Sequence, residues 1–235
     1  MLPGSRMPGS TMPGSTKRST TSWLRACWTR ARGPLLAMAM ALTLLPGTAQ
    51  AHTLLVMGDS LSAAYGIDPQ AGWVSLLEHK LGKGYPVINA SISGETTSGG
   101  AARLPELLKQ HHPDIVLLEL GGNDGLRGLS PQQMKVNLAK MVERSRAEGA
   151  RVLLLGIEVP PNYGPAYTNA FRNVFTQLAD EHDLPLVPFL LENVDLDSML
   201  QADGIHPTAE AQPIILANVW AKLEPMLADD VDDQR

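Results

Sequence analysis

The residues best suited to covalent chemistry are a serine, a histidine and an aspartate that stand at opposite ends of the chain. Ser60 follows Gly58 and Asp59 directly after the short apolar run 53–57, which predicts a buried strand. A glycine lets the backbone turn sharply out of such a strand, and open α/β folds place reactive groups at the carboxyl ends of their strands. Gly-Asp-Ser also occurs in ordinary turns, so this stretch alone does not identify a nucleophile.

The histidines supply a partner for this serine. Of the six histidines, only His206 has an aspartate three residues earlier, in Asp203-Gly204-Ile205-His206-Pro207. On a turn of this length the carboxylate of Asp203 and the imidazole can project in the same direction. Asp203 then accepts a hydrogen bond from Nδ1–H, while Nε2 faces the serine as a general base. The three residues together predict nucleophilic catalysis by a serine.

Two glycine-containing loops follow later predicted strands and offer hydrogen-bond donors. The loop 91–97 contains Gly94, whose backbone N–H can approach a bound group closely, and the segment 121–124 reads Gly-Gly-Asn-Asp, in which Asn123 carries a side-chain amide. Each loop alone is compatible with an ordinary turn. Their shared position after the carboxyl ends of strands favours one common site. Asp59 is interpreted as a structural residue whose carboxylate accepts N–H groups of its own loop.

The elements that must position these residues follow from the pattern of apolar residues. Unbroken apolar runs predict strands near 53–57, 85–90, 115–120, 152–157 and 186–189. Apolar residues at helical spacing predict helices near 73–81, 104–108, 130–149, 171–178 and 211–227. Alternating strands and helices with apolar strands indicate a parallel sheet covered on both faces, a three-layer α/β/α sandwich.

The first 51 residues have the composition of a leader. They begin with the low-complexity run MLPGSR, MPGST, MPGST, followed by a basic region, an apolar run at 34–45 and the small-residue site Ala49-Gln50-Ala51. This order is typical of a secretory signal peptide. The apolar run is shorter than the roughly 20 residues that a membrane-spanning helix needs. We therefore expect cleavage near Ala51, export to the periplasm or the medium without a membrane anchor, and a single domain over 52–235.

Removal of this leader would leave a distinctly acidic protein. The leader holds six of the 19 basic residues and none of the 24 acidic residues, so 52–235 carry 13 basic against 24 acidic residues, a net charge of −11. Such a surface repels phosphate backbones and anionic lipid, which argues against nucleic-acid or membrane binding as a main function. The one cysteine, Cys27, lies in the leader, so no disulfide is expected in the exported chain.

Four segments occur in the order found in one enzyme family. They are Gly58-Asp59-Ser60-Leu61-Ser62, Gly94, Gly121-Gly122-Asn123-Asp124 and Asp203-Gly204-Ile205-His206-Pro207. In these segments the chain resembles the GDSL or SGNH hydrolase family, and within it the subgroup of bacterial periplasmic thioesterases, lysophospholipases and arylesterases. The resemblance covers nearly all of 53–227. It implies a flavodoxin-like sheet of five parallel strands in the order 2-1-3-4-5.

The resemblance also implies a role for each motif residue. Ser60 would be the nucleophile, His206 the base and Asp203 its partner, while Ser60 N–H, Gly94 N–H and the Asn123 amide would form the oxyanion hole. The reaction would be acyl transfer to water in two steps through an acyl-enzyme. Its partners would be small acyl esters or thioesters, and we expect a monomer. No cofactor is needed, and no metal is expected, because the adjacent His111 and His112 would point apart.

Apolar residues close to these motifs suggest the substrate. Leu126 and Leu129 follow the oxyanion asparagine, Pro160 follows the fourth predicted strand, and Ile205 precedes His206. If they meet an acyl chain, the enzyme prefers medium to long chains, with arylesters and lysophospholipids as further substrates. The alternative is that both leucines simply pack their loop against the core. Two alternatives remain, a carbohydrate O-acetylesterase and an inactive binding module of the same fold. Comparison of acetyl with octanoyl esters separates the two enzymes.

Overall fold

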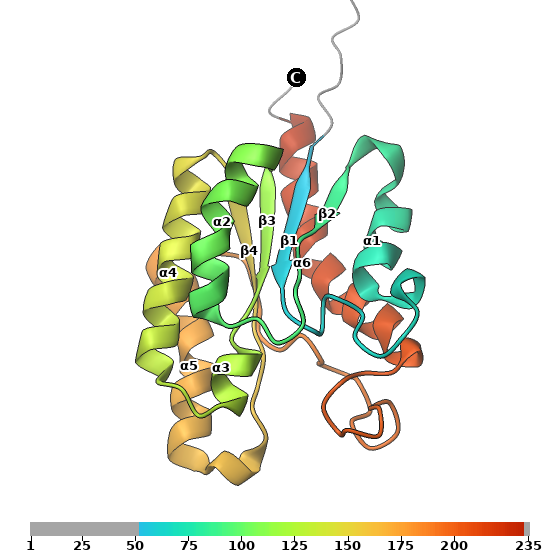
Figure 1. Ribbon diagram of the computed structural model, residues 1–235. Coiled ribbons are helices and arrows are strands. Elements are labelled where there is room, and N and C mark those ends of the chain that lie inside the picture. Colours follow the sequence, from blue (N-terminus) through green and yellow to red (C-terminus); the bar gives the residue numbers. More distant parts are fainter. Residues whose placement is uncertain (1–51, 233–235) are drawn as a thin grey trace, which may run out of the picture. The chain divides into compact units, whose positions relative to one another are not determined.

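Five short apolar strands form one parallel sheet in a computed structural model that describes residues 52–232 (Figure 1). In chain order they are β1 (Leu54–Gly58), β2 (Val87–Asn89), β3 (Ile115–Glu119), β4 (Arg151–Leu155) and β5 (Leu186–Val187). Their spatial order is β2-β1-β3-β4-β5, and every pairing is parallel. This is the predicted flavodoxin-like order. The predicted leader and its cleavage site near Ala51 lie outside the described residues.

Residues 52–232 contain six α-helices, five of which cover the two faces of this sheet. The six helices are α1 (Trp73–Leu81), α2 (Thr97–His111), α3 (Gly122–Leu126), α4 (Pro131–Ala147), α5 (Pro165–His182) and α6 (Gln212–Asp232). Short 3-10 turns lie at Pro69–Ala71, Gly82–Gly84, Pro161–Tyr163 and Ala209–Ala211. Helices α1 and α6 pack together on one side of the sheet, and α2, α4 and α5 pack in succession on the other (Figure 1). The predicted three-layer α/β/α sandwich is therefore confirmed.

Local signals explain where several elements begin and end. Ser130 caps α4 by accepting from Gln133 N–H, and Thr96 caps α2 by accepting from Gly99 N–H. Strand β5 ends before the predicted boundary at 189, because Pro188 has no N–H with which to continue the ladder. Every residue of β1 and β3 is buried, as expected for strands covered on both faces.

One element was not predicted. The segment Gly122–Leu126, where a turn was expected, forms the short helix α3. Gly121 precedes it with a φ of 129°, a conformation that a side chain would make unfavourable, and its carbonyl accepts from Gly125 N–H at 2.9 Å. Helix α3 brings Asn123 to the carboxyl edge of the sheet. Among residues 52–232 no helix is long and apolar enough to cross a membrane.

Candidate active site

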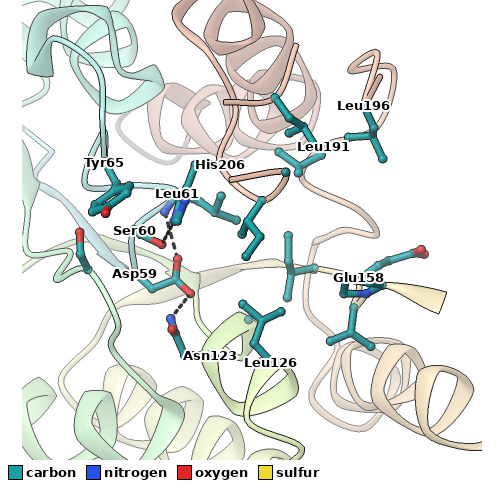
Figure 2. Close-up of a pocket in the computed structure, with 18 of the residues that line it drawn as sticks. Asp59, Ser60, Leu61, Tyr65, Asn123, Leu126, Glu158, Leu191, Leu196 and His206 are labelled. Atoms are coloured by element: carbon teal, nitrogen blue, oxygen red, sulfur yellow. Dashed lines mark hydrogen bonds between the residues drawn. The ribbon is translucent and has the colours of Figure 1, made fainter. Parts of the chain in front are cut away.

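The structure brings Ser60, His206 and Asp203 into one hydrogen-bonded chain, of which Figure 2 shows Ser60 and His206. Ser60 comes two residues after the end of β1, and its Oγ lies 2.8 Å from His206 Nε2. On the other side of the ring, His206 Nδ1 lies 2.6 Å from Asp203 Oδ2. With the proton on Nδ1 donated to the carboxylate, Nε2 is the nitrogen that can accept the serine proton. This is the geometry of a serine nucleophile with its base.

Asp203 is held as an ionised carboxylate although it is exposed. Its Oδ1 accepts from the backbone N–H groups of Ile205 and His206, both at 3.0 Å. The hydrogen bond with the His206 side chain, followed by these two backbone bonds, lowers the pKa of Asp203 to about 2. The carboxylate therefore stays charged at every pH at which the imidazole needs an orienting acceptor.

Tyr65 is a site residue that sequence reasoning missed. Tyr65 is half-exposed. The centroid of its ring lies 4.4 Å from that of the His206 ring, and the two ring planes are inclined by 39°. Gln201 ties the two loops together, because its Nε2 donates to Tyr65 O at 2.8 Å and its backbone N–H donates to His206 O at 2.7 Å. The ring thus braces one face of the imidazole. Nothing in the local sequence signals this contact, since it arises only when the two distant loops meet.

Asp59 occupies a very different environment directly beside Ser60. It is 2% exposed, its Oδ1 accepts from Leu61 N–H at 3.0 Å, and its Oδ2 accepts from Asn123 Nδ2 at 3.0 Å. Burial raises the pKa of Asp59 to about 6, against the lowering effect of these hydrogen bonds. The geometry agrees with the interpretation of Asp59 as a structural residue, and adds that it holds Asn123.

Glu119 is the second residue that sequence reasoning missed. It is the last residue of β3, fully buried, and its Oε2 accepts from Asp59 N–H at 3.1 Å and from Ser62 Oγ at 2.8 Å. A Cβ on Gly58 would lie 2.8 Å from Glu119 Oε2 and 2.7 Å from Ser62 Oγ, so only glycine fits there. Burial, followed by the charge of Asp59, raises the pKa of Glu119 well above its usual range. The available signal was a single acid at the end of an otherwise apolar strand.

The three predicted oxyanion donors line the same cavity. Ser60, Gly94 and Asn123 all border it, and Gly94 adopts a φ of 80°. Within residues 52–232 neither Ser60 N–H nor Gly94 N–H has an acceptor, and Asn123 spends one of its two amide hydrogens on Asp59. The unspent donors are available to an oxygen atom bound beside Ser60.

Polar contacts hold the Gly94 loop and α3 in place. Asp124, which is 3% exposed, accepts from Thr97 Oγ1 at 2.6 Å and from Thr97 N–H at 2.8 Å, and so ties the start of α2 to α3. On the exposed side, Arg127 Nη2 donates to Gly94 O at 3.0 Å. The two loops that carry Gly94 and Asn123 are thereby fixed relative to each other.

The cavity has a volume of about 480 Å³ and is largely apolar on one side of Ser60. Leu126, Leu191 and Leu196 lie away from Tyr65 in Figure 2. Its apolar lining comprises Leu61, Leu126, Ile157, Val159, Pro160, Pro161, Phe189, Leu191, Leu196, Leu200 and Ile205. Of the candidate substrate-binding residues, Leu126, Pro160 and Ile205 are therefore in place.

Leu129 does not line the cavity, in contrast to the expectation. Leu129 is 45% exposed. Its backbone is anchored in the turn after α3, because Leu129 N–H donates to Asp124 O at 2.9 Å and Tyr167 Oη donates to Leu129 O at 2.7 Å. This turn leaves the Leu129 side chain at the surface.

Comparison with known proteins shows the family to which the chain is similar. The profile of the GDSL-like lipase/acylhydrolase family matches residues 56–213. The esterase TesA of Pseudomonas aeruginosa is 55% identical over 200 residues, which are 83% of this chain and 100% of that protein. Thioesterase 1/protease 1/lysophospholipase L1 of Escherichia coli K12 is 48% identical over 77% of this chain and 88% of that protein. An arylesterase of Vibrio mimicus is 45% identical over 80% of this chain and 96% of that protein.

Solved structures show the same similarity in three dimensions. A crystal structure of TesA has a TM-score of 0.72 and 56% identity, and covers 74% of this chain and 99% of that chain. The psychrotrophic esterase EstA from Pseudoalteromonas sp., in a structure inhibited by monoethylphosphonate, has a TM-score of 0.70 and 41% identity, and covers 75% of this chain and 99% of that chain. Both comparisons extend over nearly the whole of the matched proteins.

Proposed function

The chain belongs to the GDSL-like lipase/acylhydrolase family and is a carboxylic ester hydrolase, and from this premise we propose that it is an exported esterase and thioesterase that forms an acyl-enzyme on Ser60. The observation that carries the proposal is the hydrogen-bonded chain from Ser60 through His206 to Asp203, which opens onto an apolar cavity. The names of the three relatives, an esterase, a thioesterase/lysophospholipase and an arylesterase, support the same chemistry.

The first step transfers the acyl group to the enzyme. Ser60 Oγ attacks the carbonyl carbon, and its proton passes to His206 Nε2 across the 2.8 Å hydrogen bond. Asp203 stabilises the imidazolium that forms. The carbonyl oxygen becomes an anion that accepts from Ser60 N–H, Gly94 N–H and Asn123 Nδ2. When the tetrahedral intermediate collapses, the bond to the leaving oxygen or sulfur breaks, and His206 returns its proton to the leaving alcohol or thiol.

The second step transfers the acyl group to water. His206 takes a proton from a water molecule, whose oxygen attacks the carbonyl carbon of the Ser60 ester. The same three donors hold the second oxyanion. The bond to Ser60 Oγ then breaks, and His206 returns the proton to the serine. The products are a carboxylic acid and the free enzyme, with no cofactor consumed.

The shape of the site supports medium to long acyl chains as substrates. Leu126, Leu191 and Leu196 offer an apolar surface next to the nucleophile, and an acetyl group would leave most of the cavity of about 480 Å³ empty. Each methylene that the cavity removes from water adds up to ~0.8 kcal/mol to binding. We propose arylesters and lysophospholipids as further substrates. Their acyl or aryl group would occupy the same surface.

The location of the enzyme is part of the proposal. The basic region, the apolar run at 34–45 and the site Ala49-Gln50-Ala51 support export and cleavage, which would leave a monomer that begins at His52 in the periplasm or the medium. Intact-mass analysis of the exported protein tests this. A mature protein that retains residues 17–45 would contradict it.

The decisive experiment combines a covalent trap with a nucleophile variant. An alkyl phosphonate ester should add one phosphonyl group to the wild-type protein, with the loss of its leaving group, and should stop hydrolysis of a p-nitrophenyl ester. Ser60→Ala should bind none and show no acyl-enzyme. His206→Ala should be nearly as inactive, because the two residues act as a unit. Wild-type turnover by Ser60→Ala would refute the proposal.

A series of acyl chain lengths tests the substrate class. In the wild type, kcat/KM should rise roughly two- to fourfold per added carbon from acetyl toward octanoyl until the cavity is full. Leu126→Ala should flatten this rise and leave acetyl-ester hydrolysis almost unchanged. Leu129→Ala is the matched control, since Leu129 lies outside the cavity, and should keep the wild-type profile. A rate that falls from acetyl to octanoyl in the wild type would favour an O-acetylesterase instead.

A further inference from the structure

The proposed reaction does not use Glu119, although this residue is buried directly beneath the catalytic loop. Glu119 ends β3, where it pairs with Gly58 at the end of β1. Its Oε2 accepts from Asp59 N–H and Ser62 Oγ, so one carboxyl oxygen joins the residues on either side of the Ser60-Leu61 pair. The burial of a carboxylate is costly unless it is fully hydrogen-bonded, so the buried carboxyl group of Glu119 must be stabilised by its surroundings.

The second oxygen of Glu119 indicates whether the carboxyl group carries a proton. Among the described residues Glu119 Oε1 is buried and finds no donor. The Asp59 carboxylate is buried beside it, since Asp59 N–H donates to Glu119 Oε2 at 3.1 Å and Asp59 is only 2% exposed. Two ionised carboxylates are acceptors only and would repel each other in this dry site, whereas a pair that shares one proton forms a hydrogen bond. The contact therefore requires a proton on one of the two groups.

The surroundings decide which group carries the proton. Asp59 already accepts from Leu61 N–H and from Asn123 Nδ2, two donors that favour its ionised form. The other charged groups that act on Asp59 are His206 and Asp124. Glu119 also accepts two bonds, but both reach Oε2; the residue is fully buried and Oε1 has no donor, so ionisation would leave the charge on Oε1 uncompensated. The proton belongs on Glu119.

We propose that Glu119 is a positioning residue that acts as an uncharged carboxylic acid: Oε2 accepts from Asp59 N–H and Ser62, and the hydroxyl at Oε1 donates to the carboxylate of Asp59. Asp59, held in this way, holds the Asn123 amide at 3.0 Å. The inference rests on the proposed function, since Asn123 matters here as a donor to the oxyanion. The buried acid thus orients a donor that it does not touch.

The kinetic test compares two substitutions of similar size. Glu119→Gln keeps an oxygen that accepts from Asp59 N–H and Ser62 and gains an amide N–H that donates to Asp59, so its kcat should stay within about threefold of the wild type. Glu119→Leu removes all three bonds. Its kcat should fall by about tenfold or more, but by less than the roughly 10²–10³ expected for the loss of an oxyanion donor. KM should change little, because Asn123 acts in the transition state.

Ser145→Ala is the matched control for the removal of a buried polar group. Ser145 is 1% exposed and donates only to Met141 O within α4, away from the cavity, so this variant should keep both kcat and KM. An equal loss of kcat in Glu119→Gln and Glu119→Leu would show that the charge of Glu119 is needed, and would overturn the proposal. Wild-type kcat in Glu119→Leu would overturn it as well.

A spectroscopic test reads the proton directly and does not depend on whether Glu119→Leu folds. The infrared difference between the wild type and Glu119→Gln at mildly alkaline pH should contain the C=O stretch of one protonated carboxylic acid. Its absence would overturn the proposal whatever the kinetics show. Failure of the proposed function is a different result: the wild type would not hydrolyse esters or react with the phosphonate, while the infrared band would still report on Glu119.

Discussion

Asp59 and Asp203 both serve the same serine, yet their environments shift their pKa values in opposite directions. Asp59 is buried at the end of β1, and loss of water raises its pKa to about 6. Asp203 lies on an exposed loop, where hydrogen bonds to His206 and to backbone N–H groups lower its pKa to about 2. The site thus consists of a buried half around Asp59, which holds Asn123, and an exposed half around Asp203, which orients His206.

The difference between these halves separates folding from chemistry. In the buried half, each polar group is held by another buried group, so removal of one leaves a donor or acceptor without a partner. In the exposed half, water replaces any bond that is lost, and only the orientation of the imidazole suffers. Substitutions in the two halves should therefore differ in how their effects divide between stability and kcat.

The largest effect is expected for Asp203→Asn. An amide at this position favours the wrong tautomer of His206, which in another serine hydrolase lowers kcat by about 10⁴. Because Asp203 is exposed, the free energy of unfolding should fall only slightly near neutral pH, by less than in Asp59→Asn. A loss of stability as large as that of Asp59→Asn would show that the exposed half supports the fold to the same extent.

A smaller loss is expected for Asn123→Ala, which removes one oxyanion donor. Removal of a comparable asparagine in another hydrolase costs roughly 10²–10³ in kcat. KM should change little, since the interaction forms mainly in the transition state. Steady-state kinetics with one p-nitrophenyl ester measure both quantities, and a purely KM effect would mean that Asn123 binds the ground state instead.

Asp59→Asn should lower stability more than it lowers kcat, which is the opposite of Asp203→Asn. The new amide turns an N–H toward one of the two donors, Leu61 N–H or Asn123 Nδ2, so the free energy of unfolding should fall by about 1–3 kcal/mol. The loss in kcat should be smaller than that of Asn123→Ala, because Asn123 itself remains. Urea unfolding and kinetics on the same sample provide the comparison. Intact stability with a large loss of kcat would break the division proposed here.

The smallest effect is a pair of opposite pH dependences of stability. The pKa of Asp59 is raised from 3.8 to about 6 on folding, so the folded state favours its protonated form, and this contribution is lost as pH rises through about 6. The pKa of Asp203 is lowered from 3.8 to about 2, so its contribution is present above 3.8 and is lost as pH falls toward 2.

Unfolding of the wild type and of each asparagine variant across this range tests both signs. Relative to the wild type, Asp59→Asn should be most destabilised near pH 4 and recover as pH rises past about 6. The difference for Asp203→Asn should instead vanish toward pH 2. Slopes of the same sign for both variants would contradict the contrast between the two halves.

The sequence predicted the strands and the positions of the motifs well, because both depend on local patterns. Apolar runs mark the five strands, and the motifs with Ser60, Gly94 and Asn123 follow the ends of β1, β2 and β3. The resemblance to a known family then supplied the strand order and the roles of Ser60, Asp203 and His206, whose hydrogen-bonded arrangement the structure shows.

The residues that escaped prediction depend on contacts between distant segments. Glu119 reads as the end of a strand until β1 and β3 are placed in register. Tyr65 meets His206 only after Gln201 joins their loops. Leu129 seemed equivalent to Leu126, but a hydrogen bond from Tyr167 of α5 fixes the turn that leaves it at the surface. Apart from the single acid at the end of the apolar strand β3, these contacts carry no local sequence signal.

The position of β1 in the middle of the sheet has a consequence for biosynthesis. The ribosome makes the nucleophile early, yet β1 cannot pair on both sides until β2 and β3 have followed, and Ser60 meets its base only 146 residues later. A growing chain therefore cannot form the hydrogen bond between Ser60 and His206 until residue 206 has been made. Under the proposed function, hydrolytic activity follows the folding of the whole domain.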